Sequence, residues 1–208
     1  MSGHPLFARL YGRFAPLGES AGSAAHRDEL LASASGRVFE VGAGSGLCFG
    51  HYPYSVTEVV AAEPEPYLRH LATQAAAAAP VPIRVMDTDA EHLPFDDATF
   101  DVVVASLVLC SVPDQQRALR EVRRVLRPGG ELRIYEHIRS EDPRHARRQD
   151  RIAWIWPHLV GGCHPNRDTI AAITQVGLRV QACRRFEFRL GAACAPVSPH
   201  VIGVAVRP

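Results

Sequence analysis

The fold of this 208-residue chain is decided by the stretch Glu40-Val41-Gly42-Ala43-Gly44-Ser45-Gly46, which closes a short apolar run starting at Arg37. Gly42 and Gly44 allow a tight turn and a close backbone approach to a ligand, and Gly46 lets a following helix start against it. A phosphate-binding dinucleotide loop has the spacing G-x-G-x-x-G, whereas this chain has G-x-G-x-G with an acid two residues earlier. The stretch therefore predicts a strand, a turn and a helix around a nucleotide-like ligand.

On either side of this loop, short β-branched runs alternate with helical patterns. The predicted strands are 37–41, 56–62, 83–86, 100–105, 131–136, 178–188 and 201–206. Helices are predicted over 67–79 and 115–126, the second with Asp114 as its N-cap and ended by Pro128-Gly129-Gly130. This alternation is typical of βαβ units, so we expect an α/β fold with a mainly parallel sheet.

Two segments fall outside the alternation, and both are expected to lie beside the carboxyl ends of the strands, where open α/β sheets bind ligands. Residues 4–33 predict one or two helices, and residues 139–165 carry Ile152, Ile155, Trp156 and Leu159 at helical spacing. We expect one domain over 1–208, because this length suits a single core. Its parts are an N-terminal helical lid (1–33), a cofactor-binding core (34–138), an acceptor-site insert (139–167), and a last helix with the final strands (168–208).

Acidic residues follow three successive predicted strands. Glu40 beside the glycine loop attracts a cation such as an α-ammonium and repels a pyrophosphate, although an acid there can also simply cap backbone amides. Glu63 can accept both hydroxyls of a ribose. Asp89 can accept a hydrogen bond from an adenine amino group, with the Ala90 amide at a ring nitrogen; taken alone it fits an Asx turn better. Together the three acids predict a phosphate-free, ammonium-bearing nucleoside cofactor.

The bulk composition excludes several other classes. A net charge of +1 gives no drive toward nucleic acid or an anionic membrane. The five cysteines are scattered and form no C-x-x-C pair, so we expect neither a disulfide framework nor a metal site, and a reducing compartment. No signal peptide or membrane-length apolar run is recognisable, which predicts a cytoplasmic protein without membrane contact. Nothing in the sequence indicates an oligomeric state.

Motifs along residues 36–138 follow one another in a characteristic order. They are Glu40 to Gly46, Glu63-Pro64, Asp89-Ala90 with Leu93-Pro94-Phe95, Phe100-Asp101, and Val125-Leu126-Arg127-Pro128-Gly129-Gly130. This series resembles the class I S-adenosylmethionine-dependent methyltransferases, in the type 11 branch that holds small-molecule and quinone C-methyltransferases. The resemblance implies a Rossmann-like, doubly wound, mainly parallel seven-stranded sheet of order 3-2-1-4-5-7-6. It also implies S-adenosyl-L-methionine as cofactor and S-adenosyl-L-homocysteine as product.

Further motifs extend the similarity beyond the core. They are His51-Tyr52-Pro53, Leu107 to Val112, Glu136-His137 and Gly161-Gly162-Cys163-His164-Pro165-Asn166-Arg167. These resemble the methyltransferase-like thiol S-methyltransferases, from which the chain departs at Pro165, where an apolar residue is usual. We also expect no N-terminal membrane anchor of the kind found in the human members of that family. The resemblance implies a cofactor site formed by Tyr11, Glu40, Gly42, Ala43, Gly44, Gly46, Glu63, Pro64, Asp89, Ala90, Ser106 and Leu107.

The predicted reaction is an in-line displacement on the methyl carbon, for which positioning supplies most of the catalysis. A thiol acceptor must react as its thiolate, and a histidine near the methyl group can act as the base. His137, after the fifth strand, and His164, in the glycine–histidine turn, are the catalytic candidates; each can instead be structural. A further expectation is an apolar acceptor pocket, and its candidate residues are Trp154, Ile155, Trp156, Phe7 and Phe14.

The leading functional hypothesis is therefore methylation of a small-molecule acceptor, first of all a thiol or dithiol. The nearest alternative is O-, N- or C-methylation of a quinone, lipid or secondary metabolite. An NAD-dependent oxidoreductase is a remoter alternative, because Glu63 suits the ribose of NAD equally well. The last alternative is a protein that binds the cofactor without catalysing a reaction.

Overall fold

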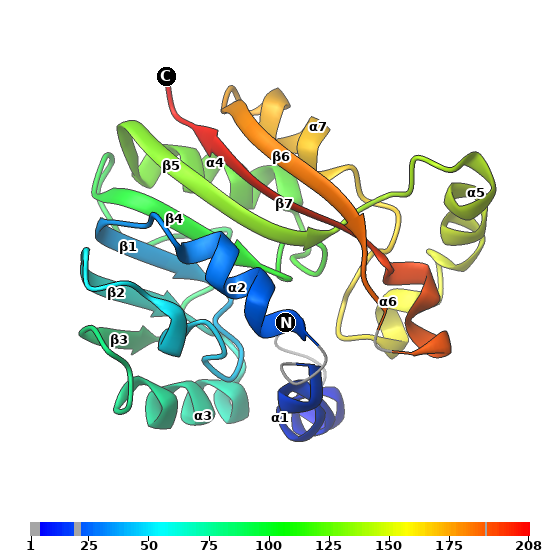
Figure 1. The fold of residues 1–208 in the computed structure, drawn as a ribbon, viewed down its shortest axis with the longest axis horizontal. Coiled ribbons are helices and arrows are strands. Elements are labelled where there is room, and N and C mark those ends of the chain that lie inside the picture. The colour runs from blue at the N-terminus through cyan, green and yellow to red at the C-terminus, as the bar shows by residue number, and fades with distance from the viewer. Residues whose placement is uncertain (1–4, 19–21, 190) are drawn as a thin grey trace.

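The structure, a computed structural model, describes residues 5–18, 22–189 and 191–208, in which seven strands form one sheet of order β3-β2-β1-β4-β5-β7-β6 (Figure 1). They are β1 (Gly36–Val41), β2 (Val56–Ala62), β3 (Ile83–Met86), β4 (Phe100–Ser106), β5 (Leu126–His137), β6 (Arg179–Glu187) and β7 (Pro199–Val206). Strands β1 to β5 pair in parallel, whereas β7 runs antiparallel to both β5 and β6. The predicted Rossmann-like fold and strand order are confirmed.

Helices cover both faces of the sheet (Figure 1). They are α1 (Pro5–Gly18), α2 (Ala24–Leu31), α3 (Pro66–Ala76), α4 (Gln115–Val125), α5 (Pro143–Ile152), α6 (Trp156–Leu159) and α7 (Thr169–Gln175), with 3-10 turns η2 (Phe49–His51) and η3 (Ala192–Val197). Side chains of β4 alternate between the two layers: Val103 packs in the core under α4 and α7, and Val104 in the core under α2 and α3. The continuous apolar run in this strand is explained by that double burial.

Helix α4 begins where its apolar spacing and its N-cap predicted, but it ends at Val125, one residue earlier than expected. The Asp114 carboxylate accepts from the Arg117 amide at 2.9 Å, and Leu119 and Val122 are fully buried. Leu126 is already extended and pairs with Phe100 of β4. The chain thus passes from helix into strand at Leu126, ahead of Pro128-Gly129-Gly130.

The glycine loop is followed by turns and by the short 3-10 turn η2, not by the α-helix that the sequence predicted. Glycine is a poor helix former, and Gly44, Gly46 and Gly50 fall within this short connection. The fully buried Phe49 fills the core at this place.

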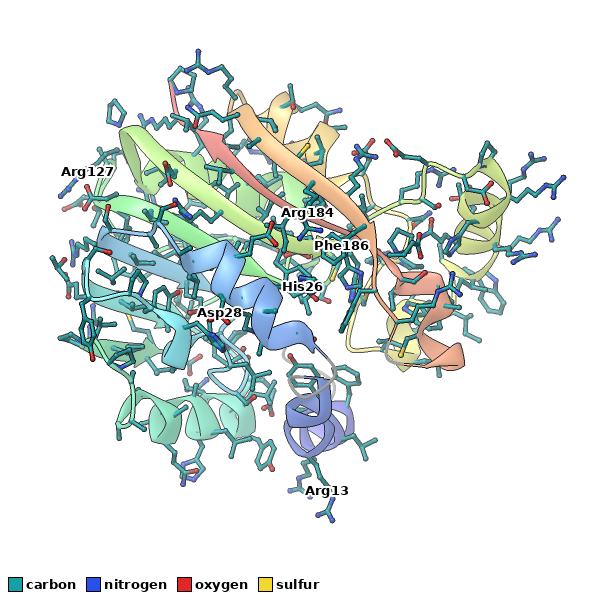
Figure 2. All side chains as sticks on the ribbon, in the orientation of Figure 1. Arg13, His26, Asp28, Arg127, Arg184 and Phe186 are labelled. Atoms are coloured by element: carbon teal, nitrogen blue, oxygen red, sulfur yellow. The ribbon has the colours of Figure 1, made fainter. Side chains whose placement is uncertain are left out.

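Aromatic and ionic contacts anchor α2 to the sheet. The His26 ring lies beside the Phe186 ring, with 4.4 Å between their centroids (Figure 2). The centroid of the Tyr135 ring is 5.4 Å from that of His26. Arg184 of β6 forms an ion pair with Glu29. Helix α1 packs instead on α3, where Gly12 lies against Leu71 and Tyr67. Across the described ranges, no helix is long and apolar enough to cross a membrane.

Candidate active site

The glycine loop leaves β1 through three residues in the left-handed region of backbone space. Gly42, Gly44 and Gly46 have φ of +61°, +58° and +82°, a conformation that costs other residues about 1 kcal/mol or more. A Cβ on Gly42 would lie 2.2 Å from Val108 Cγ2, and one on Gly46 within 3 Å of Phe49 and Ala75. Gly42 and Gly44 therefore face the site, while Gly46 seats the loop against the core.

Glu63, at the end of β2, holds this loop in place. Its Oε2 accepts from the Gly44 amide at 2.8 Å and its Oε1 from the Glu65 amide at 2.9 Å. Burial raises the pKa of Glu63, and these two hydrogen bonds act against the rise. Each carboxylate oxygen keeps lone-pair capacity for a further donor.

Glu40 lies deeper than the sequence suggested. Its side chain is 2% exposed, its Oε2 accepts from the Tyr52 hydroxyl at 2.7 Å, and it does not line the cavities described below. Burial raises the pKa of Glu40 to about 7, against the lowering effect of the Tyr52 hydrogen bond. The buried Ala43 likewise supports the loop from behind.

Two cavities meet at Gly42 and Val108, at the carboxyl ends of the parallel strands. The first, of about 470 Å³, is the more polar of the two and lies over the ends of β2 and β3. Among its lining residues are Glu63, Pro64, Asp89 and Ala90. Asp89 Oδ1 also accepts from the Glu91 and His92 amides at 2.8 and 2.9 Å, so the residue forms an Asx turn and lines the cavity at once.

The second cavity, of about 300 Å³, is mostly apolar and lies under α1 and the insert. Tyr11, Gly44, Ser106 and Leu107 line its entrance from the glycine loop. The Tyr11 ring covers the loop, since its Cε1 would lie 3.5 Å from a Cβ on Gly44. The two cavities therefore share Gly42 and Val108 in their walls and lie next to each other at the glycine loop.

The segment after β4 is held in a strained conformation by a buried acid. Leu107 has φ of +57°, which is unusual for a non-glycine residue. The fully buried Glu136 carboxylate accepts from the amides of Val108 and Leu109 at 2.8 and 2.7 Å and of Cys110 at 3.3 Å. Glu136 thereby shapes the wall that both cavities share, a role the sequence analysis did not assign to it.

His137 ends β5 and lines the second cavity, and the sheet register determines which residue faces it. In the antiparallel pairing of β5 and β7 it stands opposite His200, at 4.6 Å between ring centroids. His137 Nδ1 lies 3.7 Å from the Cys110 sulfur and 3.6 Å from the Cys163 sulfur. Burial lowers the pKa of His200 to about 3, so its ring is neutral and its Nδ1–H donates to the Ser198 carbonyl at 2.8 Å.

A double glycine closes the insert over this cavity. Gly161 and Gly162 have φ of +55° and +87°, and a Cβ on Gly161 would lie 2.3 Å from Phe7 Cε1. The turn places Cys163 against Cys110, and the His164 amide donates to the Cys110 carbonyl at 2.8 Å. The His164 ring itself does not line the cavity.

The prediction of which residues line an apolar acceptor pocket was largely wrong. Trp154 is 74% exposed, and neither it nor Ile155 or Trp156 lines the cavity, because the helix ends at Ile152 and α6 begins only at Trp156. Phe7 does line it, while the Phe14 side chain lies outside the described residues. Several lining residues belong to no motif that the sequence analysis singled out: Phe188, Cys194, Val197 and His200.

Comparison with known proteins agrees with this fold. Residues 39–134 match the family model described as a methyltransferase domain. The thiol S-methyltransferase TMT1B of Mus musculus is 32% identical over 85% of this chain and 74% of its own length; TMT1A of Homo sapiens is 31% identical with the same coverage. The solved geranyl diphosphate C-methyltransferase of Streptomyces coelicolor has a TM-score of 0.69 at 14% identity, covering 88% of this chain and 77% of that one.

The fold and these matches define an S-adenosylmethionine-dependent methyltransferase. Within that class, the chain belongs to the family of the thiol S-methyltransferases TMT1A and TMT1B.

Proposed function

We propose that this enzyme transfers the methyl group of S-adenosylmethionine to the sulfur of a small apolar thiol. The observation that carries the proposal is the pair of neighbouring cavities that share Gly42 and Val108, one more polar and the other mostly apolar. When bound, the cofactor supplies an electrophilic methyl group on a sulfonium. The names of the relatives, which are thiol S-methyltransferases, support a thiol as acceptor.

The polar cavity is the proposed nucleoside site. Glu63 accepts the ribose hydroxyls, and Asp89 with the Ala90 amide and Pro64 holds the adenine, because these groups line one cavity. The glycine loop, Ser106 and Leu107 hold the amino-acid portion, with Tyr11 as the cover. Glu40 favours the α-ammonium through its charge from behind the loop.

The apolar cavity is the proposed acceptor site. Phe7, Val160 and Val197 exclude water from it, which favours a small apolar molecule. His137 lines the cavity and can take up the acceptor's proton, whereas His164 lies outside it and holds the insert through its backbone. We therefore propose His137, and not His164, as the base that takes up the proton of the acceptor.

The test is a matched acceptor series with one carbon frame: benzyl mercaptan, benzyl alcohol and benzylamine. We expect release of S-adenosylhomocysteine with the thiol and little with the other two. Turnover confined to the alcohol or the amine would replace the thiol proposal with O- or N-methylation. Calorimetric binding of S-adenosylmethionine and not of NAD is expected, and the reverse preference would overturn the cofactor assignment.

A further inference from the structure

Three side chains that line the acceptor cavity bring two sulfur atoms and one imidazole nitrogen close together. Cys110 follows β4, His137 ends β5 and Cys163 comes from the insert, so distant segments converge here. Their ligand atoms all lie within 4.8 Å of one another. Cys110 and Cys163 are 0% and 4% exposed.

The spacing of these atoms matches a metal coordination shell. Zinc forms bonds of about 2.3 Å to sulfur and about 2.0–2.1 Å to nitrogen, and in a tetrahedron these lengths separate sulfur from nitrogen by about 3.6 Å. The separations from His137 Nδ1 are 3.6 Å to the Cys163 sulfur and 3.7 Å to the Cys110 sulfur. The three atoms therefore need little movement to share one cation.

We propose that Cys110, Cys163 and His137 form a binding site for Zn²⁺ or a similarly thiophilic cation. Two thiolates with an imidazole suit such an ion, and three protein ligands leave its fourth position open, as in catalytic zinc sites. All three residues line the acceptor cavity, so the open position faces the space proposed for the acceptor. The spacing of cysteines along the chain gave no sign of this site, because the fold alone assembles it.

Charge balance supports the site. Each thiol releases one proton to solvent on binding, so two thiolates neutralise one dication in an otherwise apolar cavity. The part that the cation plays in catalysis rests on the proposed function, methyl transfer to a thiol, and adds to it how the thiol is activated. With the cation bound, His137 is a ligand, and the cation replaces it in the role of base described above. An acceptor thiol that takes the fourth position then loses its proton to solvent, and the cation holds its sulfur as a thiolate.

The test uses the full chain, reduced and stripped of metal with a chelator, without cofactor or acceptor. Titration with Co²⁺ should give a thiolate-to-cobalt charge-transfer band that saturates at one ion per chain and is abolished by Zn²⁺. Cys163→Ser should greatly weaken the band. Cys183→Ser is the matched control, since Cys183 is exposed on β6 and outside the cavity. No charge-transfer band, or one equally strong in Cys163→Ser, would overturn the site.

A second measurement avoids any dependence on the folding of variants. X-ray absorption of the zinc-loaded wild-type chain should show a shell of two sulfurs and lighter atoms, whereas a shell of only nitrogen and oxygen would contradict the proposal. Because neither experiment measures turnover, the site can fail while thiol methylation stands. Conversely, thiol turnover that persists at full rate in the metal-stripped enzyme would remove the cation from catalysis.

Discussion

At the scale of single residues, the site depends on buried acids that hold backbone amides. Glu63 and Glu136 each accept several of them. Their carboxylates therefore define where the glycine loop and the segment after β4 lie.

Glu63→Ala should weaken binding of S-adenosylmethionine, because it removes the acceptor for the Gly44 amide and the proposed partner of the ribose. A charge-assisted hydrogen bond contributes about 1.5–3 kcal/mol, so we expect a loss of that order by calorimetry. Glu65→Ala is the control: Glu65 is buried and caps α3 through the Leu68 amide, but it does not line the cavity. Equal affinities of the wild type and Glu63→Ala would remove the ribose assignment.

Glu40→Gln should change how stability depends on pH. Since the pKa of Glu40 rises from 4.5 to about 7 on folding, the unfolded chain ionises first as the pH increases. Between these values this group lowers the free energy of unfolding by roughly 3 kcal/mol in total, with no further change above about pH 7. Gln cannot titrate, so the stability of the wild type relative to the variant should fall over that range in urea denaturation. A difference that is constant with pH would contradict the burial of an ionisable Glu40.

At the scale of elements, the acceptor cavity depends on how the insert meets α1. The turn at Gly161 and Gly162 lets the chain approach Phe7 and carries Cys163 to Cys110. The approach to Phe7 does not tolerate a side chain at Gly161.

Gly161→Ala should therefore open the acceptor cavity while leaving the nucleoside cavity intact. The new methyl group would meet the Phe7 ring at 2.3 Å on a backbone of positive φ, and we expect a stability loss of about 1–3 kcal/mol. Turnover of the thiol should drop while calorimetric affinity for S-adenosylmethionine is retained. Gly50→Ala is the matched control, because no atom lies within 4 Å of its added Cβ. Normal thiol turnover in Gly161→Ala would show that the insert does not shape the site.

At the scale of the whole molecule, the sequence predicted those features that depend on a local pattern of residues, namely the strands and the acids that follow them. The apolar run of β4 was predicted to be buried on both faces, and it is. Glu63 and Asp89 were predicted to meet at the carboxyl ends of successive strands, and both line one cavity there. Contacts that depend on register could not be predicted. His200 faces His137 only because of the antiparallel pairing of β5 and β7. Likewise, Trp154 points to solvent because its helix ends before it, which helical spacing does not reveal.

The most direct test of methyl transfer to sulfur uses an acceptor that carries both a thiol and a hydroxyl on one ring, such as 4-mercaptophenol, with a methyl-labelled cofactor. The enzyme presents one cavity to both groups, so their competition reports the chemistry of transfer and not access to the site. We predict that nuclear magnetic resonance of the product shows the label on sulfur, as a methyl thioether. A methyl ether, with the label on oxygen, would contradict the account.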